Sequence, residues 1–190
     1  MVEKDNKIRI GVFPGSFNPP HKGHIELLNH LISNNYVDKI IVIPTGNYWD
    51  KSNLIDVDKR ITMLKFYQSD KIIINDDLND VTYTYLLMRR LKDRYKDACF
   101  SLIIGMDNLE KFHLWKNFEE LLNNEIIVIP RKDYKCEVPY DIKVVDKYLE
   151  NNISSTKIRE LIKENRTDEL DNYLDIKVKK YILENKLYND

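Results

Sequence analysis

Two kinds of segment alternate regularly along the sequence. Short runs rich in isoleucine and valine each have the length and composition of a strand buried on both faces. These runs are Ile8–Phe13, Lys39–Pro44, Lys71–Ile74, Phe100–Gly105, Ile126–Pro130 and Ile142–Val145. Segments with helical spacing of apolar residues separate them, at 25–32, 57–67, 83–91 and 118–122. The alternation predicts an α/β fold, a Rossmann-like doubly wound parallel sheet with helices on both faces.

The pattern changes after Val145, where three segments with helical spacing follow one another without a strand: 156–163, 168–173 and 178–184. We expect a single domain over residues 1–190, with an α/β core at about 1–150 and a helical C-terminal part at 151–190. Ligands of open α/β sheets bind at the carboxyl ends of the strands, so the chemistry is expected at that edge.

Charge and cysteine content exclude several classes of protein. The 30 basic residues nearly cancel the 31 acidic ones, which argues against a nucleic-acid binder. No apolar stretch reaches the roughly 20 residues of a membrane-spanning helix, and nothing near Met1 resembles a signal peptide. Cys99 and Cys136 have no partner at metal-ligand spacing and are interpreted as reduced, buried thiols. We therefore expect a cytoplasmic protein without membrane or nucleic-acid partners.

The segment after the first predicted strand has the properties of a phosphate site. A helix is predicted to begin near His24, and a helix that starts directly after such a strand presents free N–H groups and its dipole to an anion. Gly15 and Gly23 allow the backbone to approach a ligand closely, and Ser16 offers a hydroxyl. These residues predict a cradle for a triphosphate.

His21 and His24 lie three residues apart in this segment. Both fall on one face if the first helical turn begins between them. An isolated pair of this kind more often has a structural role, but two of the four histidines of the chain lie within this Gly/Pro-rich loop. Both are therefore candidate catalytic residues. A metal site would need two more ligands, and none is nearby, so no metal held by protein side chains is expected.

A second candidate segment runs from Ile153 to Arg159. It places Ser154, Ser155 and Thr156 at the start of a predicted helix, with Arg159 one turn further on. Helix capping explains one hydroxyl but not three in register with an arginine. A helix N-terminus with a guanidinium could bind the leaving pyrophosphate.

Both segments resemble motifs of the nucleotidyltransferase superfamily. The run Gly15–His24 is similar to its signature loop, which ends in an HxGH motif, and Ile153–Arg159 is similar to its ISSTxIR motif. Across essentially the whole chain, the resemblance is to the bacterial nicotinate-nucleotide adenylyltransferase family. It implies AMP transfer from ATP, accompanied by Mg²⁺, to nicotinate mononucleotide in NAD biosynthesis, with His21, His24 and Arg159 as catalytic residues.

The resemblance also implies the residues that bind each substrate. ATP contacts are expected from Phe13, Gly15, Ser16, Phe17, Lys22, Gly23, Gly105, Ile153, Ser154, Ser155 and Thr156. Acceptor contacts are expected from Asn47, Lys51, Thr84, Asp107 and Trp115. Trp115 could stack on a pyridine ring, Thr84 with nearby N–H groups could receive a carboxylate, and Asp107 could accept hydrogen bonds from a ribose.

One segment departs from the family. Members usually carry Pro-Pro-His-Lys after the second strand, whereas this chain keeps Lys51 but has Tyr48, Trp49 and Asp50 before it. The acceptor therefore stays open between nicotinate mononucleotide, nicotinamide mononucleotide and phosphopantetheine, and cytidylyl transfer is a further alternative. The family of phosphopantetheine enzymes lacks the pattern of Thr84 and Trp115, which disfavours that acceptor. A non-catalytic nucleotide-binding regulatory module and a homo-oligomer are also compatible with the sequence.

Overall fold

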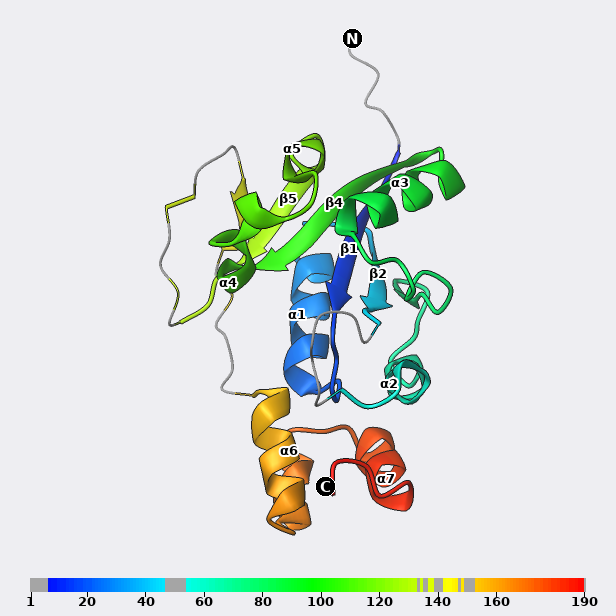
Figure 1. The fold of residues 1–190 in the computed structure, drawn as a ribbon, viewed down its shortest axis with the longest axis vertical. Helices are drawn as coiled ribbons and strands as arrows, with labels where there is room; N and C mark the ends of the chain where they lie inside the picture. Colours follow the sequence, from blue (N-terminus) through cyan, green and yellow to red (C-terminus); the bar gives the residue numbers. More distant parts are fainter. Residues whose placement is uncertain are drawn as a thin grey trace.

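The computed structural model describes residues 7–46, 54–132, 134, 137–138, 142–146, 148 and 153–189. Within these residues the centre of the fold is a six-stranded parallel sheet in the order β3-β2-β1-β4-β5-β6 (Figure 1). The strands are β1 Ile8–Gly15, β2 Lys39–Pro44, β3 Ile72–Ile74, β4 Ala98–Gly105, β5 Glu125–Ile129 and β6 Lys143–Val144. The predicted doubly wound parallel sheet is confirmed.

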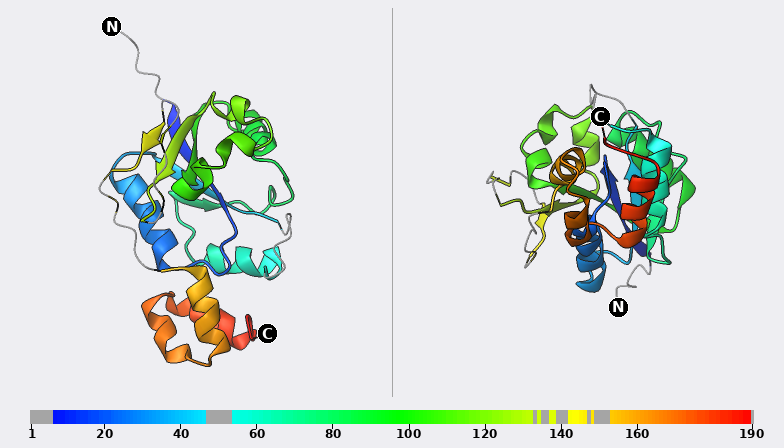
Figure 2. Two further views of the ribbon diagram at one scale, coloured as in Figure 1. Left: turned by 60° about the vertical axis from the view of Figure 1, so that its left-hand side comes forward. Right: turned by 90° about the horizontal axis from the view of Figure 1, so that it is seen from below.

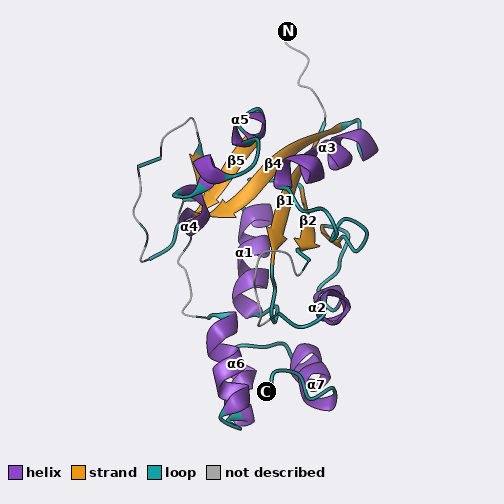
Figure 3. Ribbon diagram, in the orientation of Figure 1, coloured by secondary structure: helices purple, strands orange, loops and turns teal. Residues whose placement is uncertain are grey.

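Helices connect the strands and continue after the last one (Figure 3). They are α1 Lys22–Ser33, α2 Val57–Lys65, α3 Thr84–Arg94, α4 Met106–Leu109, α5 Phe118–Leu121, α6 Ser155–Lys163 and α7 Ile176–Glu184. Two 3₁₀ turns, η1 Phe112–Leu114 and η2 Thr167–Asn172, complete the described elements. The sequence analysis did not predict the four-residue helix α4 or the three-residue turn η1.

The sheet is buried on both faces because successive strand residues point to opposite sides. On one side, Leu87 and Leu91 of α3 pack in a cluster with Val12 of β1. On the other side, Leu28 of α1 packs in a cluster with Val42 of β2.

Two predictions of burial were wrong. The run Ile142–Val145 was expected to be buried on both faces, but both residues of β6 are exposed, and Val145 is the buried residue of the run. The reason is that β6 lies at the sheet edge and pairs only with β5. Cys99, expected to be buried, is exposed near the start of β4, and Cys136 lies outside the described residues.

The helices α6 and α7 with η2 form a third cluster of buried residues, which includes Met63 of α2. In Figure 1 this helical part lies beyond the arrowheads of β1 and β2, and the left view of Figure 2 shows the same arrangement from another direction. The helical part therefore lies at the carboxyl edge of the sheet, next to the start of α1. None of the helices in the described ranges is long and apolar enough to cross a membrane.

Candidate active site

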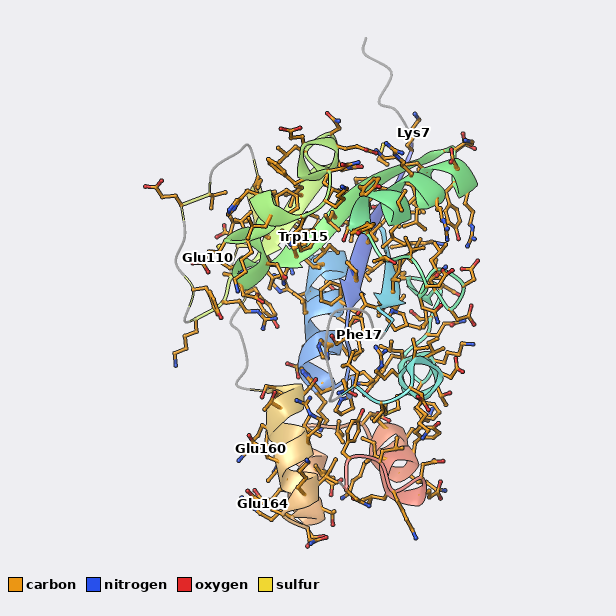
Figure 4. The ribbon with its side chains drawn as sticks, viewed as in Figure 1. Lys7, Phe17, Glu110, Trp115, Glu160 and Glu164 are labelled. Carbon is orange, nitrogen blue, oxygen red and sulfur yellow. The ribbon has the colours of Figure 1, made fainter. Side chains whose placement is uncertain are left out.

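A cavity of about 880 Å³ opens at the carboxyl edge of the sheet. Its volume lies in the range of small-molecule sites. The predicted site residues in its lining are Phe13, Gly15, Ser16, Phe17, His21, Gly23, His24, Thr84, Gly105, Asp107, Trp115, Ile153, Ser154 and Ser155. Figure 4 labels two of them, with Trp115 on the side of β4 and Phe17 closer to the helical part. One cavity thus joins residues predicted to bind ATP with residues predicted to bind the acceptor.

The two histidines stack against each other at the start of α1. The helix begins at Lys22, directly after His21, and the two imidazole centroids are 3.7 Å apart at an interplanar angle of 25°. The backbone N–H of His21 donates to Nδ1 of His24 at 3.2 Å. A neutral imidazole that accepts at Nδ1 carries its proton at Nε2, so His24 retains one N–H donor for a ligand.

The histidine pair is held in the neutral form at pH 7. Burial lowers the pKa of His21 to about 4, with a further contribution from the positive charge of Arg131. The pKa of His24 is also well below its ordinary value of 6.5, because of burial and then the charges of His21 and Arg131. Before a ligand binds, the pair therefore offers hydrogen-bond donors rather than positive charge.

The buried side chain of Arg60 supports residues 15–21, the part of the Gly15–His24 motif that precedes α1. These residues are called the signature loop from here on. Its Nη1 donates to the carbonyl of Ser16 at 2.6 Å, and its Nε donates to the carbonyl of Ile55 at 3.1 Å. Arg60 is fully buried. In a trans peptide the carbonyl and the following N–H point in opposite directions, so this contact turns the N–H of Phe17 away from Arg60.

Aromatic packing fixes the conformation of Phe17, whose φ of 47° lies in the left-handed region. Its ring packs edge-on against Phe13 at 5.6 Å and His24 at 5.1 Å. A side chain at Gly15 would place its Cβ 3.0 Å from the Phe17 ring. Glycine at position 15 therefore lets Phe17 cover the loop beside the histidine pair.

The hydroxyls of the second motif have three different partners. Ser154 caps α6 by accepting from the N–H of Lys157 at 3.2 Å, and Ser155 donates to the carbonyl of Pro19 at 2.8 Å. Thr156 accepts from the Nη2 of Arg159 at 3.3 Å. The motif therefore borders the cavity and also stabilises the signature loop through the hydrogen bond from Ser155.

Arg159 and Lys22 point to the protein rather than to the cavity. Arg159 Nη1 donates to the carbonyl of Asn18 at 2.8 Å, and Lys22 Nζ donates to the carbonyl of Asp171 at 2.7 Å. As far as the structure describes the cavity lining, it does not include Lys22, Thr156 or Arg159. Their contact with phosphates stays a prediction.

The described residues that were predicted to bind the acceptor follow β3 and β4. Thr84 is the first residue of α3, and Asp107 follows β4 directly in α4. A side chain at Gly105 would collide with Oδ1 of Asp107, so glycine is required for this carboxylate to lie where it does. Trp115 packs against Phe112, with ring centroids 5.3 Å apart. Asn47 and Lys51 lie outside the described residues.

Arg131 is a lining residue that the sequence analysis missed. Its Nε lies 3.5 Å from Oδ1 of Asp107, and its charge contributes to the low pKa of both histidines. It comes two residues after the end of β5, so the rule that places ligands at the carboxyl ends of strands could have identified it. Among the described residues, no group of three His, Cys, Asp or Glu side chains could hold a metal ion.

Comparisons with known proteins identify the family. A model of the cytidylyltransferase-like family matches residues 12–161. The nicotinate-nucleotide adenylyltransferase of Bacillus subtilis is 34% identical, with 95% of this chain and 98% of the relative covered. A probable nicotinate-nucleotide adenylyltransferase of Flavobacterium johnsoniae is also 34% identical, with coverages of 95% and 99%.

A solved structure is similar over nearly the whole chain. The Plasmodium falciparum nicotinic acid mononucleotide adenylyltransferase complexed with NaAD has a TM-score of 0.80 and 26% identity, with 96% of this chain and 98% of that chain covered. The fold, the two sequence motifs and the relatives all indicate the same family. This chain belongs to the nicotinate-nucleotide adenylyltransferase family of cytidylyltransferase-like proteins.

Proposed function

We propose that the chain transfers AMP from ATP to nicotinate mononucleotide, with nicotinate adenine dinucleotide and pyrophosphate as products. The observation that carries this proposal is the single cavity that joins the histidine pair of the signature loop to Thr84, Asp107 and Trp115. The relatives from Bacillus subtilis and Flavobacterium johnsoniae are named for this reaction, the adenylyl transfer to nicotinate nucleotide.

The reaction is an in-line displacement. An oxygen of the acceptor 5′-phosphate forms a bond to the α-phosphorus, while the bond from that phosphorus to the bridging oxygen breaks and its electron pair leaves with pyrophosphate. An ionised phosphate needs no general base at pH 7. The protein contributes position and charge stabilisation, and Mg²⁺ arrives with ATP as part of that substrate.

His24 has the donor geometry for this role, since its Nδ1 is occupied and its proton is at Nε2. The negative charge of a bound triphosphate favours the protonated form of a nearby imidazole, which opposes the effect of burial on the pKa of His24 and His21. Binding of ATP therefore favours proton uptake by the pair, and His24 can take up a proton at Nδ1 only by losing its hydrogen bond from the N–H of His21.

The acceptor side has a matching group for each part of nicotinate mononucleotide. Trp115 provides an aromatic face for the pyridine ring, and the N-terminus of α3 at Thr84 provides N–H groups for its carboxylate. Asp107 has a buried Oδ1 that can accept from a ribose hydroxyl, and Arg131 adds positive charge beside it for the phosphate.

The test is pyrophosphate release from MgATP with nicotinate mononucleotide and nicotinamide mononucleotide in parallel assays. We expect a strong preference for the acid, loss of activity in His24→Ala and retained activity in His30→Ala. His30 lies in the same helix but contacts the carbonyl of Asp146, so it controls for changes to α1. Binding of ATP without pyrophosphate release from either acceptor would contradict the proposal.

A further inference from the structure

A tyrosine from the far end of the chain reaches the signature loop. The hydroxyl of Tyr188 donates to Oδ1 of Asn18 at 3.0 Å, across 170 positions of sequence. Both side chains are buried, with 3% of Asn18 and 9% of Tyr188 exposed. The N–H of Ile55 approaches the same amide oxygen at 3.4 Å. Asn18 is therefore fixed from two directions, three residues before His21.

The backbone that carries Tyr188 is in an unfavourable conformation. Lys186 has a φ of 50° and Tyr188 a φ of 65°, both in the left-handed region that side chains other than glycine rarely adopt. Such conformations persist only where surrounding contacts determine them, and they concentrate at functional sites. Leu187, buried between them, anchors the turn through its N–H to the carbonyl of Ile182 at 3.0 Å. The turn directs Tyr188 to Asn18.

The helical part supports the loop at neighbouring points as well. The carbonyl of Tyr173 accepts from the N–H of Lys22 at 2.9 Å, at the start of the helix that carries His24. The carbonyl of Asn18 accepts from Arg159 at 2.8 Å. The backbone and the side chain of Asn18 are thus both bonded to the helical part, whose clustered residues include Tyr188.

The Tyr188 hydroxyl is suited to a permanent structural bond. Burial raises its pKa above the ordinary value of 10, so the hydroxyl keeps its proton at neutral pH. Asn18 Oδ1 is an acceptor that cannot titrate. At neutral pH the tyrosine hydroxyl is therefore the donor and the amide oxygen the acceptor.

We propose that Tyr188 is a positioning residue for the transfer reaction, acting through Asn18 to hold the signature loop in the conformation that aligns His21 and His24 with the phosphates. The kinetic part of this proposal rests on the proposed function. The structural part, that Tyr188 restrains residues 15–21, does not.

The test compares Tyr188→Phe with Tyr67→Phe. Tyr67 packs against the same hydrophobic cluster, but its buried hydroxyl has no hydrogen-bond partner among the described residues, and the charge that acts on it is that of Asp175, the N-cap of α7, not of a loop residue. Each variant loses one buried hydroxyl. We expect kcat/KM for ATP to fall about tenfold in Tyr188→Phe, as for loss of one buried hydrogen bond, and to change less than twofold in Tyr67→Phe.

Two measurements separate positioning from general packing. Amide exchange over residues 15–21, without substrate, should be about tenfold faster in Tyr188→Phe and unchanged in Tyr67→Phe. In an Asn18→Leu background, the further change Tyr188→Phe should have no additional effect on kcat/KM, because the acceptor is already absent.

The kinetic and exchange experiments can each contradict the proposed role of Tyr188. Equal effects of both tyrosine variants, or an undiminished effect of Tyr188→Phe in the Asn18→Leu background, would overturn the proposal. If the wild-type chain releases no pyrophosphate, the proposed function fails, and the exchange comparison alone decides whether Tyr188 restrains the loop.

Discussion

Acidification should destabilise the protein through its buried histidine pair. The pKa of His21 is about 4 in the folded protein and about 6.5 in an unfolded chain. Between these values the unfolded state binds more protons than the folded state, so the free energy of unfolding falls as the pH falls. The stability is fully present above pH 6.5 and is lost progressively towards pH 4. His24 shifts in the same direction.

The size of the effect follows from the shift. One pKa unit corresponds to about 1.4 kcal/mol, so His21 alone should remove about 2 kcal/mol between pH 7 and pH 5. Carboxylates such as Asp38 and Asp77 also have lowered pKa values, owing to their hydrogen bonds with Arg9 and Arg94. Their stability is lost only as the pH falls below the ordinary carboxyl range, so they contribute little above pH 5.

Urea unfolding at pH 7, 6 and 5 measures this directly. The wild-type protein should lose about 2 kcal/mol or more over this range, and His21→Gln should lose at least 1 kcal/mol less. His30→Gln, on the same helix but outside the cavity lining, should behave as wild type. Equal pH dependence in wild type and His21→Gln would refute the assignment of a buried neutral histidine.

Three further substitutions test other parts of the site. Arg131→Met should raise KM for the acceptor about tenfold or more and raise KM for ATP less, because Arg131 lies beside Asp107. Steady-state kinetics with each substrate varied in turn measures both constants, and a larger rise in KM for ATP would show that Arg131 binds ATP instead. Arg60→Met should lower the free energy of unfolding by about 3 kcal/mol because the Ser16 carbonyl loses a charged donor, and a urea denaturation midpoint equal to wild type would contradict this. Lys22→Met should leave KM for ATP within twofold, since its ammonium group binds a carbonyl of the helical part; a tenfold rise would show that the side chain turns to the phosphates.

Much of the fold was predictable because its signals are local. The strands β1 and β2 appear in the sequence as continuous apolar runs, and the loop between β1 and α1 carries a dense motif. The exposure of β6 was not predictable, because a short apolar run does not reveal that its strand lies at a sheet edge.

The site was predictable where position follows from the backbone and not where it depends on a long side chain. His21 ends the loop that joins β1 to α1, and Asp107 comes two residues after β4, so the parallel sheet brings them to one edge. Lys22 and Arg159 have several rotatable bonds, and sequence cannot show that both reach carbonyls of the protein. The bond between Asn18 and Tyr188 joins positions so distant that no local pattern indicates it.

The strand order has a consequence for how substrate preference can change. The signature loop leaves β1 towards α1, whereas Asp107 and Arg131 follow β4 and β5, on the other side of the point where the strand order reverses. Substitutions after β4 should therefore alter the preference for the acceptor with little effect on the loop that we propose to bind ATP. A mutant library restricted to 107–108 and 115–116 would vary the proposed acceptor side and leave unchanged Arg131, whose charge acts on both histidines of the signature loop.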